Sequence, residues 1–167
     1  MRFEVVYIDD TREEFADILR ITLKKSTDTP AHSLAVRLPF IIEKEICEVR
    51  LLDERGLIFE GVVDEQILYF SESLSTEIIA RSMEALLLDN EACPEVFTNP
   101  SSSLIFSRYA RVCSLEKLDA PGMALKGVLK VYKGTSCYQV LKEFCERVYG
   151  KAPFVLGRKL CIADNEA

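Results

Sequence analysis

The sequence predicts an α+β fold, in which an antiparallel β-sandwich or β-barrel is followed by a smaller unit of helices and strands. Three observations support this prediction. Up to about residue 80, apolar and polar residues alternate with the period of two that is typical of strands. Within residues 74–99 the apolar spacing changes to that of a helix. Beyond residue 100, two segments with helical spacing are separated by a short strand.

The composition is that of a globular protein with a sizeable core. The chain has 167 residues, of which 49% are hydrophobic and 29% charged, and this balance argues against intrinsic disorder. The 27 acidic and 21 basic residues give a net charge of −6. A nucleic-acid-binding surface normally produces a basic excess, so no nucleic-acid partner is predicted.

The cysteines and the first residues of the chain predict a protein made in a cytoplasm. Six cysteines are scattered without a C-x-x-C pair, and no secretory signal pattern precedes the first strand, so reduced thiols are predicted. The apolar runs are too short to cross a bilayer, and no membrane partner is expected.

Short alternating segments dominate the first half of the chain. The predicted strands cover residues 3–8, 19–25, 33–40, 47–52, 57–63 and 67–70. Residues 13–25 also fit a helix face, and the strand is preferred because its neighbours are strands. Residues 26–30 are predicted as a loop and residues 53–56 as a tight hairpin turn. Gly61, in the middle of a strand, predicts a bulge or a sharp bend.

Residues 74–99 connect the two halves. Residues 76–80 alternate like a strand, whereas Met83, Leu86 and Leu87 lie three and four apart. We therefore expect a strand that runs directly into a short buried helix.

The second half is predicted to contain two helices. A loop over residues 93–103 precedes a helix at 104–113, and a connector over 114–127 leads to a strand at 128–132. The strongest helix covers residues 136–149, with Thr135 or Ser136 as its N-cap and Gly150 at its end. Residues 153–162 are predicted as one returning strand, kinked at Gly157. The predicted domains are a β-barrel (1–80), a hinge helix with connector (81–127) and a small α/β unit (128–167).

No catalytic, cofactor or metal site is predicted. The acidic clusters Asp9-Asp10, Asp64-Glu65 and Asp89-x-Glu91 contain ligands that Mg²⁺ or Ca²⁺ could use, but turn and capping roles explain them better. His32 could serve as a triad base, although a hydrogen-bonded surface histidine is the better interpretation. The serines at 101–103 lack the G-x-S-x-G context of a nucleophile.

Three further patterns are interpreted as structural. Cys137 and Cys145 share one helical face and are more consistent with core positions than with a redox pair. Gly134 has no second glycine nearby to form a phosphate-binding loop. A base-stacking platform is a weaker interpretation than ordinary core for these four aromatic residues: Tyr132, Tyr138, Phe144 and Tyr149.

Four segments, taken in order, resemble a known family. They are SLAVRLPF (33–40), LIFEGVVDE (57–65), ARSMEALLLDNEA (80–92) with Asn99-Pro100, and GTSCYQVLKEFCERVYGKAP (134–153). This series resembles the N-terminal half of the baseplate hub proteins of contractile-tailed phages, prophages and phage-tail-like bacteriocins, the Mu-type late-control hub family. The similarity extends over roughly residues 15–155, and its second and third segments are the most specific.

The resemblance implies a tail-tube-like antiparallel β-barrel followed by a small α/β domain. It also implies a trimer that caps the tail tube and carries the central spike, made in the bacterial host cytoplasm and located in the virion tail or tail-like particle. Hub proteins of this kind are about twice as long and contain a second barrel, so the chain corresponds to a fragment or a shortened hub. The family contributes no catalytic residues. Independently, residues 67–70 are apolar on both faces, which predicts partners that cover an outer face.

The predicted function is therefore structural, in a tail baseplate hub, without enzymatic activity. Two alternatives remain open. Residues 128–150, with Lys133-Gly134-Thr135 at the turn, are similar to a LysM peptidoglycan-binding motif, but the chain leaves no room for that motif's second helix. The other alternative is a hydrolase that uses Asp64 and Glu65.

Overall fold

The computed structural model describes residues 1–25, 31–71 and 73–162. The loop predicted at residues 26–30 lies outside these ranges. The chain forms two compact units, of which unit 1 is Met1–Ser82 and unit 2 begins at Met83. No helix in the described ranges is long and apolar enough to span a membrane.

The described residues of unit 1 form one antiparallel sheet of seven strands in the order β2-β1-β5-β6-β7-β4-β3. The strands are β1 (Arg2–Tyr7), β2 (Arg12–Phe15), β3 (Arg20–Lys24), β4 (Ser33–Leu38), β5 (Ile46–Asp53), β6 (Gly56–Tyr69) and β7 (Ser75–Ser82). The antiparallel sheet and the α+β class are thus confirmed.

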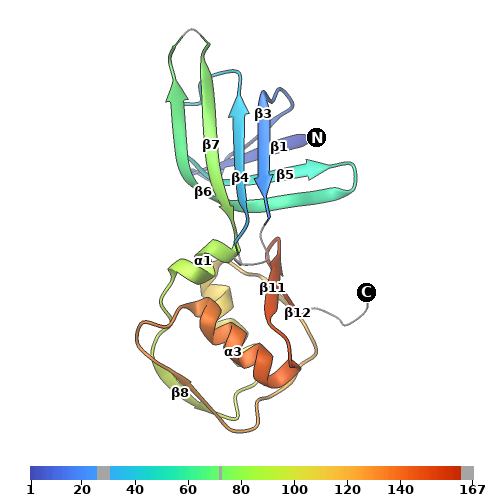
Figure 1. The fold of residues 1–167 in the computed structure, drawn as a ribbon, viewed down its shortest axis with the longest axis vertical. Coiled ribbons are helices and arrows are strands. Elements are labelled where there is room, and N and C mark those ends of the chain that lie inside the picture. Colours follow the sequence, from blue (N-terminus) through green and yellow to red (C-terminus); the bar gives the residue numbers. More distant parts are fainter. Residues whose placement is uncertain (26–30, 72, 163–167) are drawn as a thin grey trace. The chain divides into compact units, whose positions relative to one another are not determined.

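The sheet curls around a single core. Its edge strands, β2 and β3, are joined by residues 16–19 alone, which span at most about 19 Å when fully extended. The edges of a flat seven-stranded sheet would lie about 29 Å apart, so the sheet must roll up. Figure 1 shows β5 running across the direction of β3, β4 and β7. Inside the roll lie these buried side chains: Phe3, Val5, Tyr7, Leu34, Val36, Leu38, Ile42, Ile46, Val49, Leu51, Phe59, Ile78 and Ala80.

A closed barrel is not found. Among the described residues, β2 pairs only with β1 and β3 pairs only with β4, so no ladder joins the two edges. The roll has a covalent connection at residues 16–19 and a shared apolar core, but no hydrogen-bonded seam between its edges among the described residues.

Strand β6 replaces two predicted strands. Residues 56–69 form one strand that pairs first with β5 and then with β7, with a register shift between Val63 and Glu65. The polar residues between the two predicted segments belong to the strand: Asp64 accepts hydrogen bonds from Arg81, and Gln66 accepts one from the Ile46 amide. Gly61 itself pairs regularly with Val49 and Ser82, so no bulge lies at Gly61. The register of β6 shifts on either side of it, opposite Leu51–Leu52 of β5 and between Val63 and Glu65.

Two other features of unit 1 bear on the predictions. The strand preferred at 19–25 is confirmed by β3, and the two-residue turn between β5 and β6 is confirmed, with Asp53 accepting hydrogen bonds from the Arg55 and Gly56 amides. Strand β2 was not predicted, because three of its four side chains are exposed and it has no apolar alternation.

The described part of unit 2, residues 83–162, contains three α-helices and two small sheets. Its elements are α1 (Glu84–Asp89), β8 (Glu95–Thr98), α2 (Ser102–Ile105), a π-helical turn η1 (Phe106–Ala110), a 3-10 turn η2 (Arg111–Cys113), β9 (Lys117–Asp119), β10 (Val128–Val131), α3 (Cys137–Tyr149), β11 (Pro153–Leu156) and β12 (Lys159–Ile162). One sheet is β10-β8 and the other is β11-β12-β9.

The predicted strand-to-helix connection is confirmed by β7 and α1, where Met83, Ala85 and Leu87 are fully buried. The predicted helix at 136–149 is confirmed by α3. Its N-cap is Ser136, which forms a capping box with Gln139, and Gly150 ends it in the left-handed conformation.

Three expectations for unit 2 are wrong. The loop at 93–103 contains β8 and the start of α2, and the connector at 114–127 contains β9. The single kinked strand at 153–162 is a hairpin, β11–β12, that turns at Gly157 with φ of 60°. These errors concern strands of three or four residues and the four-residue helix α2, which are all too short to show a reliable period.

Candidate functional site

The acidic clusters are held by local partners. The Asp9 carboxylate lies 2.8 Å from Lys44 Nζ and accepts hydrogen bonds from Thr11. Hydrogen bonding to Lys44, together with Thr11, lowers the pKa of Asp9 to about 2. Asp64 accepts two hydrogen bonds from the Arg81 guanidinium, and within the described ranges no three acidic, histidine or cysteine side chains are placed to hold a metal ion.

The other sequence candidates occupy structural positions. Ser101 caps α2 by accepting a hydrogen bond from the Leu104 amide, and Ser102 accepts one from the Met123 amide. His32 is half-buried at the start of β4, and its Nδ1 has no hydrogen-bond partner among the described residues. The backbone amide of His32 donates a hydrogen bond to Ser82 Oγ at 2.9 Å, and the Ser82 amide donates one back to the His32 carbonyl, so Ser82 serves here as a backbone partner.

Cys137 and Cys145 are both buried in α3. Burial raises the pKa of the Cys145 thiol to about 12, so this thiol is neutral at physiological pH. The Gly134 amide donates to Glu91 Oε1 at 2.7 Å, so a carboxylate of the chain itself occupies this turn. Of the four aromatic residues, Phe144 is buried and Tyr132 is exposed, which does not make one stacking face.

The LysM-like interpretation required one strand–helix–strand unit. In unit 2, β10 pairs with β8 and β11 pairs with β12, so the strands on either side of α3 belong to different sheets. This pairing does not favour a LysM motif.

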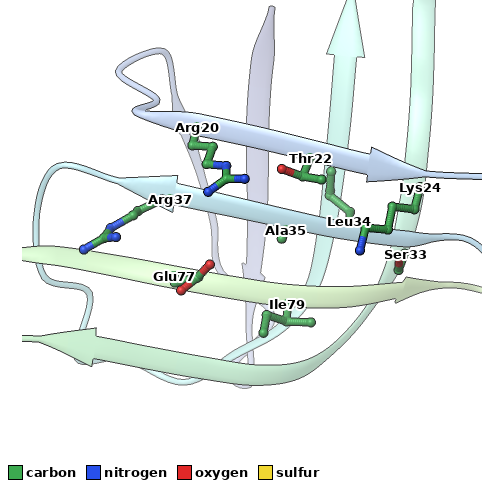
Figure 2. A pocket seen from close by; sticks show the side chains of 9 residues that line it. All are labelled: Arg20, Thr22, Lys24, Ser33, Leu34, Ala35, Arg37, Glu77 and Ile79. Carbon is green, nitrogen blue, oxygen red and sulfur yellow. The ribbon is translucent and has the colours of Figure 1, made fainter.

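The outer face of β3, β4 and β7 carries a shallow hollow of about 320 Å³, which we call the outer hollow (Figure 2). It is lined by Arg20, Thr22, Lys24, Ser33, Leu34, Ala35, Arg37, Glu77 and Ile79. Most of these side chains point away from the core, because strand residues alternate between faces.

Cross-strand register explains the shape of the hollow. One row across the sheet is Thr22–Ala35–Ile79, and the next is Arg20–Arg37–Glu77. The central strand β4 contributes the small side chains of Ser33 and Ala35, whereas its neighbours contribute longer ones. The hollow is therefore deepest over the small side chains of β4.

The charges around the hollow are unevenly distributed. Arg37 lies over the Tyr69 ring, 4.5 Å from its centroid, and donates hydrogen bonds to Ser75 Oγ. The Tyr69 hydroxyl donates to Glu77 Oε2 at 2.8 Å. Arg20 and Lys24, by contrast, are exposed and form no ion pair with any described residue. The edge at β3 is therefore cationic, although the whole chain is acidic.

The neighbouring strand β6 extends this face. Ile67 and Tyr69 lie opposite Glu77 and Ser75 on the outer side, whereas Leu68 faces inward, and all three β6 side chains are half-buried. Phe70 follows them and is 66% exposed. This end of β6 therefore carries apolar side chains on both faces of the sheet.

Sequence reasoning missed Arg20, Lys24 and Arg37 as a group. Each reads as an ordinary outward-facing residue of an alternating strand, and only the β3–β4 register places Arg20 opposite Arg37. The spacing of Arg20 and Lys24, four residues apart on one strand face, was the one available signal.

Comparisons with known proteins show which solved structures have a similar fold. No family model matches the sequence, and no curated protein matches it. The chain is similar in structure to the 43 kDa tail protein of prophage MuSo2 from Shewanella oneidensis, with a TM-score of 0.74 and 11% identity. It is also similar to a tail protein from Neisseria meningitidis (TM-score 0.70, 15% identity) and to prophage tail protein gp18 from Listeria monocytogenes (TM-score 0.61, 11% identity).

These similarities include 99%, 99% and 96% of this chain, but 53%, 52% and 49% of the three tail proteins, respectively. The chain therefore spans about half the length of the structures that it matches. Both units take part in the similarity, so the combination of a rolled sheet with a small α/β unit is a shared fold.

Proposed function

We propose that this chain is a structural component of a phage tail or a phage-tail-like particle. The observation that carries the proposal is the similarity of nearly the whole chain to solved phage and prophage tail proteins. A surface with half-buried Ile67 and Tyr69 beside exposed charges is consistent with a protein that works by contact with others. The proposal assigns the chain no enzymatic activity.

More specifically, we propose a place in the baseplate hub, between the tail tube and the central spike. The sequence resemblance to hub proteins supports this position and a trimeric arrangement. In the assembled hub the rolled sheet of unit 1 would serve as a tail-tube-like barrel, with its edges β2 and β3 covered by neighbours. Because the chain spans about half of its structural relatives, a further barrel would come from additional chain or from a partner.

Co-expression with the tail-tube and spike proteins encoded alongside it would test the proposal. Electron microscopy with an antibody against this chain should label one end of the tube, and mass measurement should give three copies per particle. A chain that stays monomeric and never joins a tube or a spike would count decisively against the hub assignment. Labelling elsewhere along the tail would retain the structural role but exclude the hub position.

A further inference from the structure

Strand β3 presents an open edge. Its ladder with β4 occupies one side, and among the described residues no strand pairs with the other side. The backbone N–H and C=O groups along such an edge are a ready template for one more strand.

The core-facing side chains of β3 are incompletely covered. Ile21 and Leu23 pack against the core of unit 1 but are only half-buried, whereas Val36 and Leu34 opposite them on β4 are fully buried. An additional strand beside β3 would place two apolar side chains next to Ile21 and Leu23 and remove their remaining surface from water.

The outward-facing side chains of β3 are charged and call for acidic rather than apolar neighbours. Arg20 and Lys24 are exposed cations without an ion pair among the described residues, and Arg20 lies directly opposite Arg37 in the ladder. Like charges at directly opposed positions destabilise a sheet. Figure 2 shows Arg20 and Lys24 on the same side of β3, with Thr22 between them. Carboxylates placed beside these cations would offset the repulsion.

We propose that β3 binds an extended acidic segment of another tail protein as an eighth strand. The first and fifth side chains of that segment are acidic and meet Arg20 and Lys24, which lie about 13 Å apart along a strand. Its third side chain is small and polar, beside Thr22, and its second and fourth are apolar, beside Ile21 and Leu23. The identity of the partner as a tail protein rests on the proposed function, whereas the chemistry of the segment rests on β3 alone.

A blocked synthetic peptide of sequence Glu-Val-Thr-Val-Glu tests this pairing on the full chain. Titration followed by NMR should shift the backbone amide signals of residues 19–25 more than those of unit 2. A peptide with lysine in place of both glutamates should not bind. A Glu-Val-Thr-Val-Glu peptide that is N-methylated at alternate residues should also fail, because it cannot form the ladder. Equal binding of the N-methylated peptide would overturn the proposal in favour of charge attraction alone.

The double variant Arg20→Glu/Lys24→Glu should bind the acidic peptide about tenfold more weakly or not at all. The control Arg55→Glu/Lys133→Glu changes the net charge equally at exposed positions outside β3, and its affinity should be unchanged. The NMR spectrum of each variant reports whether the fold is retained. Equal weakening in both variants would overturn the proposal, because net charge would then explain the binding.

Two further outcomes separate this inference from the proposed function. Self-association that disappears in the Arg20→Glu/Lys24→Glu variant would identify a second copy as the occupant and would overturn the assignment to another protein. Entry of that variant into tails at the normal level, together with absence of peptide binding, would reject the strand addition and leave the tail role intact. Peptide binding by a chain that never enters tails would retain the site and reject the tail role.

Discussion

At the scale of single residues, Gly61 shows how closely two strands of unit 1 approach. A Cβ atom at this position would overlap the carbonyl oxygen of Arg81 on β7 and crowd the ring of Phe59. The mid-strand glycine therefore reflects a close contact between two strands of the same sheet rather than a bulge at that residue. Any side chain there would force β6 away from β7.

We predict that Gly61→Ala lowers the free energy of unfolding by about 3 kcal/mol, because the backbone contact cannot be relieved by moving a flexible side chain. Denaturant unfolding followed by circular dichroism measures the change. Gly122→Ala is the control, since a Cβ at residue 122 would meet no atom within 4 Å. A loss in Gly61→Ala no larger than in the control would show that the strands separate readily.

Lys44 is the second informative residue, because its ammonium group both contacts Asp9 and lies 4.3 Å from the centre of the Tyr7 ring. The pKa of Asp9, lowered to about 2, implies that its ionised form is stabilised in the folded state. This contribution to stability is present above the unfolded-state pKa of about 3.9 and is lost as the pH falls toward 2.

We expect Lys44→Met to raise the pKa of Asp9 toward its ordinary value, because the principal hydrogen-bond donor is removed. NMR titration of the side-chain carboxyl carbon measures this directly. Lys142→Met, in α3 of unit 2, should leave the Asp9 titration unchanged. An unchanged pKa in Lys44→Met would assign the shift to Thr11 instead.

At the scale of elements, α3 is the clearest case in which local sequence signals agree with packing. The Ser136 side chain accepts a hydrogen bond from the Gln139 amide, and the Gln139 side chain accepts one from the Ser136 amide. The buried face of the helix consists of Cys137, Val140, Leu141, Phe144 and Cys145. Capping and amphipathic spacing both depend on residues within a few positions of each other, so both can be predicted from the sequence.

We predict that Ser136→Ala lowers the free energy of unfolding of unit 2 by about 1 kcal/mol, through loss of the N-cap. Hydrogen exchange of the α3 amides, together with denaturant unfolding, measures the effect. Ser107→Ala removes an exposed hydroxyl outside this cap and should change stability little. Similar losses in the two variants would indicate that the capping box contributes nothing specific.

Short strands behave differently from α3. Strands β2, β8 and β9 have three or four residues each, and most of their side chains are exposed. Their positions are decided by the strands they pair with, such as β10 for β8 and β12 for β9. Tertiary context of this kind leaves no periodic signal in the residues themselves.

At the scale of the whole molecule, alternation predicted the β-rich first half and the α+β class, but it could not predict the outer hollow. The hollow depends on the pairing of β4 with β3 on one side and with the distant β7 on the other. Sequence alone shows that Ala35 and Ile79 point outward on their own strands, and only the topology makes them neighbours. The candidate site is thus a product of strand order.

The short segment 16–19 has a mechanical consequence for unit 1. Because it tethers opposite margins of the seven-stranded sheet, its contour length limits how wide the cylinder can become. The radius of the rolled sheet is consequently limited by covalent geometry, and hydrogen bonds between its two edge strands are not needed to limit it. Residues inserted into segment 16–19 would allow the edge strands β2 and β3 to move apart. Insertions at the turn between β5 and β6 would leave the circumference of the rolled sheet unchanged.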